Sequence, residues 1–227
     1  MEAILFYLAF ITLVLLFVFG VEAGLGNRSI GFLKEMMLSE TSPSPRVSVL
    51  IPARNEVSKI QEGLASVLSQ DYPNLEVIVL DDRSSDGTSG ILSQMESRHP
   101  QLKVFRILEL PAGWIGKNHA LSYGVQRAAG ELLLFTDADV VMHASTVRKA
   151  VAYLIENRLD HLTLTPDVKI PGIPLQVLVG VFSIFFAFFF KPWKVTDPQS
   201  SRFVGIGAFN LVRKEVYLAV GTHQAIA

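Results

Sequence analysis

The sequence contains no cysteine among its 227 residues, and this absence removes several classes of protein. Without thiols the chain cannot form disulfides, use a cysteine nucleophile, or hold zinc or an iron–sulfur cluster through cysteine. The five histidines lie far apart and never at the spacing of zinc ligands. A metal centre built from cysteine or histidine is therefore not expected.

An excess of charge of either sign is also missing. The chain has 20 basic and 21 acidic residues, for a formal net charge of -1. Nucleic-acid binders gain affinity from a basic surface that neutralises phosphates, so no nucleic-acid partner is expected. Charged residues make up only 18% and hydrophobic residues 50%, which is more apolar than an ordinary soluble domain. The apolar excess is concentrated in two runs, one at the N-terminus and one late in the chain.

The first apolar run, Ala3–Val21, is long enough to cross a bilayer, because about 20 helical residues span about 30 Å. A cleaved signal peptide is the alternative, but no basic residue precedes the run. We therefore predict that residues 1–26 form one uncleaved transmembrane anchor. Arg28 and Lys34 follow it, which by the positive-inside rule places the remaining chain in the cytoplasm.

Strand-like and helix-like segments alternate after a predicted linker at residues 27–45. The strand-like runs are Val47–Ile51, Glu76–Leu80, Lys103–Ile107 and Glu131–Thr136. Between and after them apolar residues recur at helical spacing, with a helix expected over Lys117–Ala129, closed by Gly130 at C′, and another N-capped by Ser145. Length suggests one domain or two, and the alternation predicts an α/β fold with a doubly wound, mostly parallel sheet.

Asp137 and Asp139 stand directly after the fourth strand-like run. Two carboxylates two residues apart at a strand end can both face one hard cation, and Mg²⁺ or Mn²⁺ prefers such oxygen ligands. The alternative is a solvated turn, in which aspartate is common. Because ligands bind beyond the carboxyl ends of parallel strands, the sequence predicts a metal site here.

Two earlier strand ends also carry polar groups, Pro52–Glu56 and Asp81–Gly87. If the strands are parallel neighbours, these groups meet Asp137 on one rim, where a carboxylate can accept from a nucleotide base or ribose. The alternative is purely local: Asp81 and Asp82 with Ser84, Asp86 and Gly87 would form only a turn with an Asx cap for the following helix. Asn55 and Glu56 would likewise cap the helix after the first strand.

The sequence contains the motifs VSVLIPARNE (residues 47–56), DDxSxDG (81–87), GKNHAL (116–121) and DAD (137–139). In order and in spacing, over about Arg46 to Val220, these four motifs together resemble family-2 glycosyltransferases of the GT-A fold. The resemblance implies that the nucleotide pocket is lined by Pro52, Ala53, Arg54 and Glu56. Asp82 would hold the base or ribose, and Lys117 would approach the diphosphate. Asp137 would face the ribose or sugar, and Asp139, with Asp137 beside it, would ligate Mg²⁺ or Mn²⁺.

The segment PAGWIGKNHA (111–120) resembles, more narrowly, the branch associated with hopanoid and carotenoid glycosylation in bacteria. The family resemblance implies a nucleotide-sugar donor, a UDP-sugar foremost, and inversion at the sugar carbon, and the resemblance to this branch implies a lipid or polyprenoid-type acceptor. It also implies a location at the bacterial inner membrane. The nucleotide-sugar-binding α/β domain would occupy residues 46–170.

The family's later acidic pair, which supplies a general base, has no match here. Carboxylates after Asp139 are isolated: Glu156, Asp160, Asp167, Asp197 and Glu215. Gly205–Tyr217 resembles the acceptor-side strand and helix that precede that pair, and the sequence ends at Ala227, so residues 195–227 are interpreted as the start of a truncated acceptor-side region. An alcohol is a weak nucleophile without a base. We therefore expect this chain alone to bind donor but to turn it over slowly or not at all.

The second apolar run, Ile173–Phe190, is also close to the length of a bilayer crossing. A crossing would put residues 205–217 and Asp139 on opposite sides, where they could not share one site. We therefore predict that residues 171–194 form a helix in the membrane interface, with Trp193 at headgroup level, that guides a lipid acceptor. A buried core helix remains an alternative.

Three other functions compete. A nucleotidyltransferase also needs carboxylates and metal, but its first loop is typically rich in glycine and basic residues, unlike Pro52–Glu56. A phospho-accepting receiver would explain Asp81 and Asp82 but not the aspartates at 137 and 139. A catalytically inactive, membrane-associated nucleotide-binding or scaffold protein is compatible with the missing base.

Overall fold

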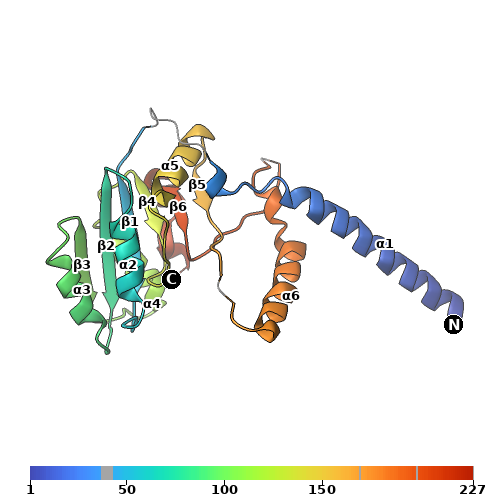
Figure 1. The fold of residues 1–227 in the computed structure, drawn as a ribbon, viewed down its shortest axis with the longest axis horizontal. Helices are drawn as coiled ribbons and strands as arrows, with labels where there is room; N and C mark the ends of the chain where they lie inside the picture. Colours follow the sequence, from blue (N-terminus) through green and yellow to red (C-terminus); the bar gives the residue numbers. More distant parts are fainter. Residues whose placement is uncertain (37–42, 169, 198, 227) are drawn as a thin grey trace. The chain divides into compact units, whose positions relative to one another are not determined.

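The computed structural model describes residues 1–36, 43–168, 170–197 and 199–226 (Figure 1). The chain divides into two compact units. The helical unit contains Met1–Glu35 and Asp167–Gly205, and the sheet unit contains Met36–Pro166 and Ile206–Ala227. Residues 37–42 of the predicted linker lie outside the described residues.

The sheet unit holds six strands in the order β3-β2-β1-β4-β6-β5. Their bounds are β1 Val47–Ala53, β2 Leu75–Asp82, β3 Leu102–Ile107, β4 Leu132–Phe135, β5 His161–Thr163 and β6 Asn210–Arg213. The first four strands are parallel neighbours, and β6 runs antiparallel to both β4 and β5. The predicted α/β fold with a mostly parallel sheet is confirmed, whereas β5 was not expected because its three residues carry no strand pattern.

Both faces of the sheet are covered by helices. Their bounds are α2 Ile60–Leu68, α3 Thr88–Glu96, α4 Gly116–Val125, α5 Thr146–Glu156 and α7 Lys214–Ala219, with a short 3₁₀ helix η3 at Thr222–Ile226. Leu50, Leu80 and Leu133 join one buried cluster with Leu121 of α4. Right-handed crossovers place α2 and α3 on the opposite face, since they lead outward from β1 while α4 leads back to β4.

The predicted helix Lys117–Ala129 ends early, at Val125, so its predicted end was wrong. Gly130 is not a left-handed C′ residue; its N–H donates to Ser48 Oγ (2.8 Å). A Cβ at Gly130 would lie 2.6 Å from the Ser48 backbone nitrogen, so the glycine permits a close approach to β1. Ser145 does stand at the N-cap of α5 but makes no capping bond there; Gln70 Oε1 accepts from the Val147 N–H instead (2.9 Å).

β1 lies between β2 and β4, and the chain leaves it toward β2 but returns, through β3 and α4, to β4 on the other side. Such a reversal of strand order opens a crevice beyond the carboxyl ends of the strands. The ends of β1, β2 and β4 therefore meet at one rim of the sheet.

The helical unit contains α1 (Glu2–Asn27), η1 (Leu33–Glu35), α6 (Ile173–Phe190) and η2 (Pro192–Lys194). By length and composition, α1 and the stretch Ile173–Lys194 are each able to cross a membrane, and neither α1 nor α6 has a buried residue. A buried core helix at Ile173–Phe190 is therefore wrong. Phe19 of α1 packs edge-on against Phe188 of α6, with ring centroids 5.0 Å apart.

Candidate active site

A cavity of about 480 Å³ opens where β1, β2 and β4 end. It is lined by Pro52, Ala53, Arg54, Glu56, Asp82, Ile115, Gly116, Lys117, Asp137, Ala138 and Asp139. Every residue that the family resemblance assigned to nucleotide or metal lies in this list. The structure thus brings residues more than 80 positions apart into one place, while their roles remain predictions.

The loops after β1 and β2 are bonded to each other. Asn55 adopts a left-handed conformation (φ 57°), and its Oδ1 accepts from the Ser85 N–H at 2.8 Å. The Glu56 N–H donates to Thr88 Oγ1 (2.9 Å). The Asn55 side chain therefore ties two loops together, and the idea that it and Glu56 cap α2 was wrong, since the described residues show no side-chain cap there.

Asp86 is structural. Its Oδ1 accepts from the Thr88 N–H (2.9 Å) at the start of α3, and its Oδ2 accepts from the Val57 N–H (3.2 Å). The hydroxyl of Thr88 also donates to it, and this bond is the largest cause that lowers the pKa of Asp86 below its ordinary value. The Asx turn considered from the sequence is present.

Asp81 and Asp82 have different environments although both are buried. Asp82 lines the cavity and forms a paired contact with Arg83, whose Nε donates at 2.7 Å and Nη2 at 3.0 Å. Asp81 accepts from the Ser89 hydroxyl through Oδ2, and its buried Oδ1 has no partner among the described residues. Of the two, only Asp82 is placed to meet a ligand in the cavity.

Asp137 and Asp139 are each held by one lysine. Lys117 Nζ pairs with Asp137 Oδ1, and Lys59 Nζ lies 3.1 Å from Asp139 Oδ2. The bond to Asp139 raises the pKa of Lys59. Both carboxylates are partly exposed, so their lysines can be exchanged for another cation.

A divalent cation fits these residues. No group of three or more histidine, aspartate or glutamate side chains gathers as a cage within the residues the structure describes. Mg²⁺ does not need such a cage, because it commonly uses one or two carboxylates together with substrate phosphates. Asp137 and Asp139 supply two carboxylates in one cavity, each already facing a positive charge.

The N-terminus of α4 lies at the same cavity. Ile115, Gly116 and Lys117 line it, and in the described structure the N-cap Ile115 makes no side-chain capping bond. The free N–H groups of a helix N-terminus attract anions. At Gly116 a Cβ would lie 2.8 Å from Asp82 Oδ2, so the glycine leaves room for the Asp82 side chain where α4 begins. The arrangement suits a phosphate group beside Lys117.

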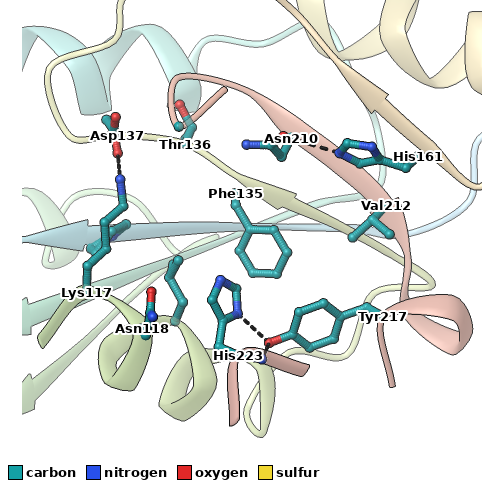
Figure 2. A pocket seen from close by; sticks show the side chains of 13 residues that line it. Lys117, Asn118, Phe135, Thr136, Asp137, His161, Asn210, Val212, Tyr217 and His223 are labelled. Carbon is teal, nitrogen blue, oxygen red and sulfur yellow. Dashed lines mark hydrogen bonds and ion pairs between the residues drawn. The ribbon is translucent and has the colours of Figure 1, made fainter. Parts of the chain in front are cut away.

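A second cavity of about 290 Å³ shares Pro52, Lys117 and Asp137 with the first (Figure 2). Its other wall comes from late residues: His161, Gly207, Asn210, Val212, Tyr217 and His223. His161 and Asn210 pair at 3.2 Å, and the Tyr217 hydroxyl and His223 Nδ1 lie 2.6 Å apart. Burial, and secondarily Lys117, lowers the pKa of His223, which favours its neutral form.

Sequence reasoning missed these histidines because neither stands in a recognisable motif. The only available signal was the assignment of Gly205–Tyr217 to the acceptor side, which includes Asn210 and Tyr217. The late carboxylates at positions 156, 160, 167, 197 and 215 are not among the residues that line either cavity in the described structure. A carboxylate base is therefore still not identified.

The sheet order and its rim define an α/β protein of the GT-A type. Residues 48–220 match the family Glycosyl transferase family 2, and the chain belongs to that family of glycosyltransferases. The 4,4'-diaponeurosporenoate glycosyltransferase of Staphylococcus haemolyticus is 27% identical over 192 residues, which cover 83% of this chain and 49% of that one. The chain spans less than half the length of curated relatives such as this one.

Two solved structures have a similar fold. The mannosyltransferase PcManGT from Pyrobaculum calidifontis, in complex with GDP-Man and Mn²⁺, matches 92% of this chain and 57% of its own, with a TM-score of 0.64 and 22% identity. S. aureus TarS 1-349 in complex with UDP-GlcNAc matches 77% of this chain and 47% of its own, with a TM-score of 0.56 and 26% identity. The first likeness, at its low identity, concerns the fold alone.

Proposed function

We propose that this chain is the donor-binding part of a membrane-attached glycosyltransferase that transfers a sugar from a nucleotide-diphosphate sugar to a lipid acceptor. The observation that carries the proposal is the meeting of Asp82, Lys117, Asp137 and Asp139 in one cavity at the switch point of the sheet. Family membership supports the reaction class. The donor is a UDP-sugar foremost, consistent with the UDP-GlcNAc bound by TarS.

In this proposal different residues bind different parts of the donor. Pro52, Ala53, Arg54 and Glu56 form the wall for the nucleotide, and Asp82 accepts from its base or ribose. Lys117 and the N-terminus of α4 face the diphosphate. Asp137 and Asp139 would hold Mg²⁺ or Mn²⁺, which would supply positive charge to the departing diphosphate.

The second cavity is the place for the acceptor hydroxyl and the transferred sugar, because it shares Asp137 and Lys117 with the donor cavity. A lipid acceptor is supported by the name of the S. haemolyticus relative, which specifies 4,4'-diaponeurosporenoate, and by the exposed apolar helices α1 and α6. Inversion at the sugar carbon follows from the family resemblance. Because no carboxylate base is assigned, we expect this chain alone to bind donor but to turn over slowly or not at all.

Attachment to the membrane is part of the proposal. α1 has no buried residue and is apolar along nearly its whole length, with a single charged residue, Glu22, after its first turn. We propose that it crosses the bacterial inner membrane once, with the sheet unit in the cytoplasm, since Arg28 and Lys34 follow it.

The competing functions are less well supported. Membership of the glycosyltransferase family argues against a nucleotidyltransferase and against a phospho-accepting receiver. A catalytically inactive scaffold protein that binds no nucleotide is distinguished from the proposed transferase by the titration described next.

The test is calorimetric titration of the detergent-solubilised chain with UDP and with GDP, each with and without Mn²⁺. We expect Mn²⁺-dependent binding of UDP, lost in Asp139→Ala. Asp71→Ala is the matched control, since Asp71 is an exposed carboxylate that also pairs with one basic side chain, Arg148 (3.0 Å), outside both cavities. If the folded chain binds neither nucleotide, or if both variants lose binding equally, the proposal fails.

A further inference from the structure

The helix α6 has no charged face. No charged residue occurs between Ile173 and Phe190, its polar side chains are Gln176 and Ser183, and most of its large side chains are exposed, from Ile173 (75%) through Phe182 (65%) to Phe189 (59%). A helix that lies on a membrane surface normally keeps one polar face. The two polar side chains of α6 do not make such a face, since Gln176 donates to the Ile170 carbonyl and Ser183 to the Val179 carbonyl, so acyl chains can surround the helix rather than cover one side.

The connection of α6 to the sheet at both ends is incompatible with a single membrane crossing by α6. β5 ends at Thr163 before α6, β6 begins at Asn210 after it, and these two residues are partners in one antiparallel ladder. Both flanks of α6 must therefore emerge on the same side of the membrane. If α6 crossed, the chain would have to cross back, and the described parts of 164–172 and 195–209 contain no helix. Irregular backbone exposed to lipid leaves its polar groups unsatisfied and does not occur.

Charged groups hold the C-terminal end of α6 against the end of α1. Lys191 Nζ lies 2.7 Å and Lys194 Nζ 3.1 Å from the Glu22 carboxylate near the end of α1. Arg202 donates to the Phe189 carbonyl (2.6 Å), which the end of the helix would otherwise leave free. Four charged side chains cannot lie among acyl chains, so the ends of α1 and α6 share one headgroup level.

The contact between the C-terminal ends of α1 and α6 is closely packed. Gly26 of α1 faces the ring of Trp193, and a Cβ on Gly26 would overlap ring atoms of that tryptophan. Trp193 is 9% exposed, and its side chain is well suited to headgroup level. Packing and ion pairs together therefore hold the C-terminal end of α6 against the end of α1.

We propose that α6 lies wholly within the leaflet on the side of the sheet unit, surrounded by acyl chains, with both ends emerging on that side. The placement rests on the membrane attachment proposed above, not on the transferase activity. The chain runs on from α6 to Gly207 and Asn210, which line the second cavity. A helix held in this leaflet fits an acceptor that is itself a lipid of the leaflet, with its hydroxyl at headgroup depth.

The absence of cysteine makes the test direct, because each introduced cysteine is unique. The full chain would carry Asp167→Cys or Gln199→Cys on the two flanks of α6, Phe182→Cys in its middle, or Glu2→Cys at the start of α1. All four positions are exposed, so the changes should not disturb folding. A membrane-impermeant maleimide is applied to spheroplasts and to inverted membrane vesicles.

We expect the flanks at 167 and 199 to be labelled only in inverted vesicles, position 2 only in spheroplasts, and position 182 in neither. Labelling of the two flanks from opposite sides would show that α6 crosses, and labelling of position 182 would show that water reaches it; either result overturns the proposal. Labelling of position 2 in inverted vesicles alone would instead refute the α1 anchor, while UDP titration tests the donor site independently.

Depth provides a second measurement. Nitroxide labels at Phe182→Cys and, as the matched control, at Val14→Cys in the middle of α1 are compared by collision with oxygen and with a water-soluble nickel complex. We expect the label at 182 to lie clearly shallower than the label at 14. Equal depth at the bilayer centre would mean that α6 crosses, and the single-leaflet placement would be abandoned.

Discussion

The parallel strands have two ends, called here the first edge, where the strands begin, and the second edge, where they end. Both carry acidic side chains, but the surroundings of these side chains differ. At the edge where the parallel strands begin, Glu76 is 3% exposed and accepts from Ser48 Oγ (2.7 Å), Lys103 Nζ (2.8 Å) and the Ala129 N–H (2.9 Å). At the edge where they end, Asp139 is 44% exposed and meets one lysine. A carboxylate saturated by the protein stabilises the fold, whereas one with a single exchangeable partner is available to a ligand.

Electrostatics supports this contrast. Burial raises the pKa of Glu76, but the Lys103 pair and the bonds from Ala129 and Ser48 outweigh it and lower the pKa to about 2. The charged form is therefore the one that the fold holds. The comparison predicts that changes at the first edge alter stability alone and changes at the second alter ligand binding alone.

The largest expected effect is that of Glu76→Gln. The variant removes the charge at the centre of a buried network, and we expect the free energy of unfolding to fall by about 3 kcal/mol. Urea denaturation measures it, with Glu62→Gln as the control, since Glu62 is an exposed glutamate on α2. The UDP dissociation constant should stay the same. Weaker UDP binding at unchanged stability would mean that Glu76 serves the ligand rather than the fold.

Acid should act through the same group. The pKa of Glu76 is depressed in the folded chain, from 4.5 to about 2, so its contribution to stability is complete above pH 4.5 and is lost as pH falls toward 2. We expect about 2 kcal/mol to be lost between pH of about 4.5 and about 3. Denaturation curves across this range should show a much smaller loss in Glu76→Gln; an equal loss would assign the acid sensitivity to other carboxylates.

A smaller effect is expected from Gly63→Ala, which tests whether the backbone of α2 positions the carboxylates at 137 and 139. A Cβ at Gly63 would overlap the Ala138 carbonyl oxygen and lie 3.3 Å from that of Val140. Because Ala138 stands between the two aspartates, we expect Mn²⁺-dependent UDP affinity to fall about tenfold, or about 1.4 kcal/mol.

Gly90→Ala is the matched control for Gly63→Ala, because Gly90 also lies in a helix but a Cβ there would meet nothing within 4 Å. This control should raise stability by about 0.5–1 kcal/mol without changing UDP affinity. If Gly63→Ala behaves like the control, α2 does not position the two aspartates.

These two edges were not equally predictable from the sequence. Asp137 and Asp139 end a run of apolar residues, and strand-end position alone places them on the ligand rim. Glu76 begins a strand and has no local signal, because its partners Ser48, Lys103 and Ala129 come from three other segments. Local periodicity predicts the strands but not the contacts made across them.

The same limit explains the errors. The helical pattern continues past Val125, but the chain turns there because the Ala129 and Gly130 N–H groups bond to Glu76 and Ser48. Asparagine commonly caps helices, yet the side chain of Asn55 bonds to the neighbouring loop at Ser85. His223 lines the second cavity and pairs with Tyr217, and no sequence motif predicts this contact. In each case a tertiary contact decided what the local sequence left open.

The smallest expected effect is that of Lys59→Met, which removes the partner of Asp139 without touching either carboxylate. A cation at Asp139 must displace the Lys59 ammonium, which lies 3.1 Å away, so its removal should favour the metal. Since exposed ion pairs are weak, we expect Mn²⁺ affinity, titrated at saturating UDP, to rise only about two- to fivefold. Arg148→Met is the control, because it removes the basic partner of the exposed Asp71 outside both cavities and should leave Mn²⁺ affinity unchanged. If Lys59→Met weakens Mn²⁺ binding instead, Lys59 supports the ligand site rather than competing with the cation, and the idea of an exchangeable partner at this edge is wrong.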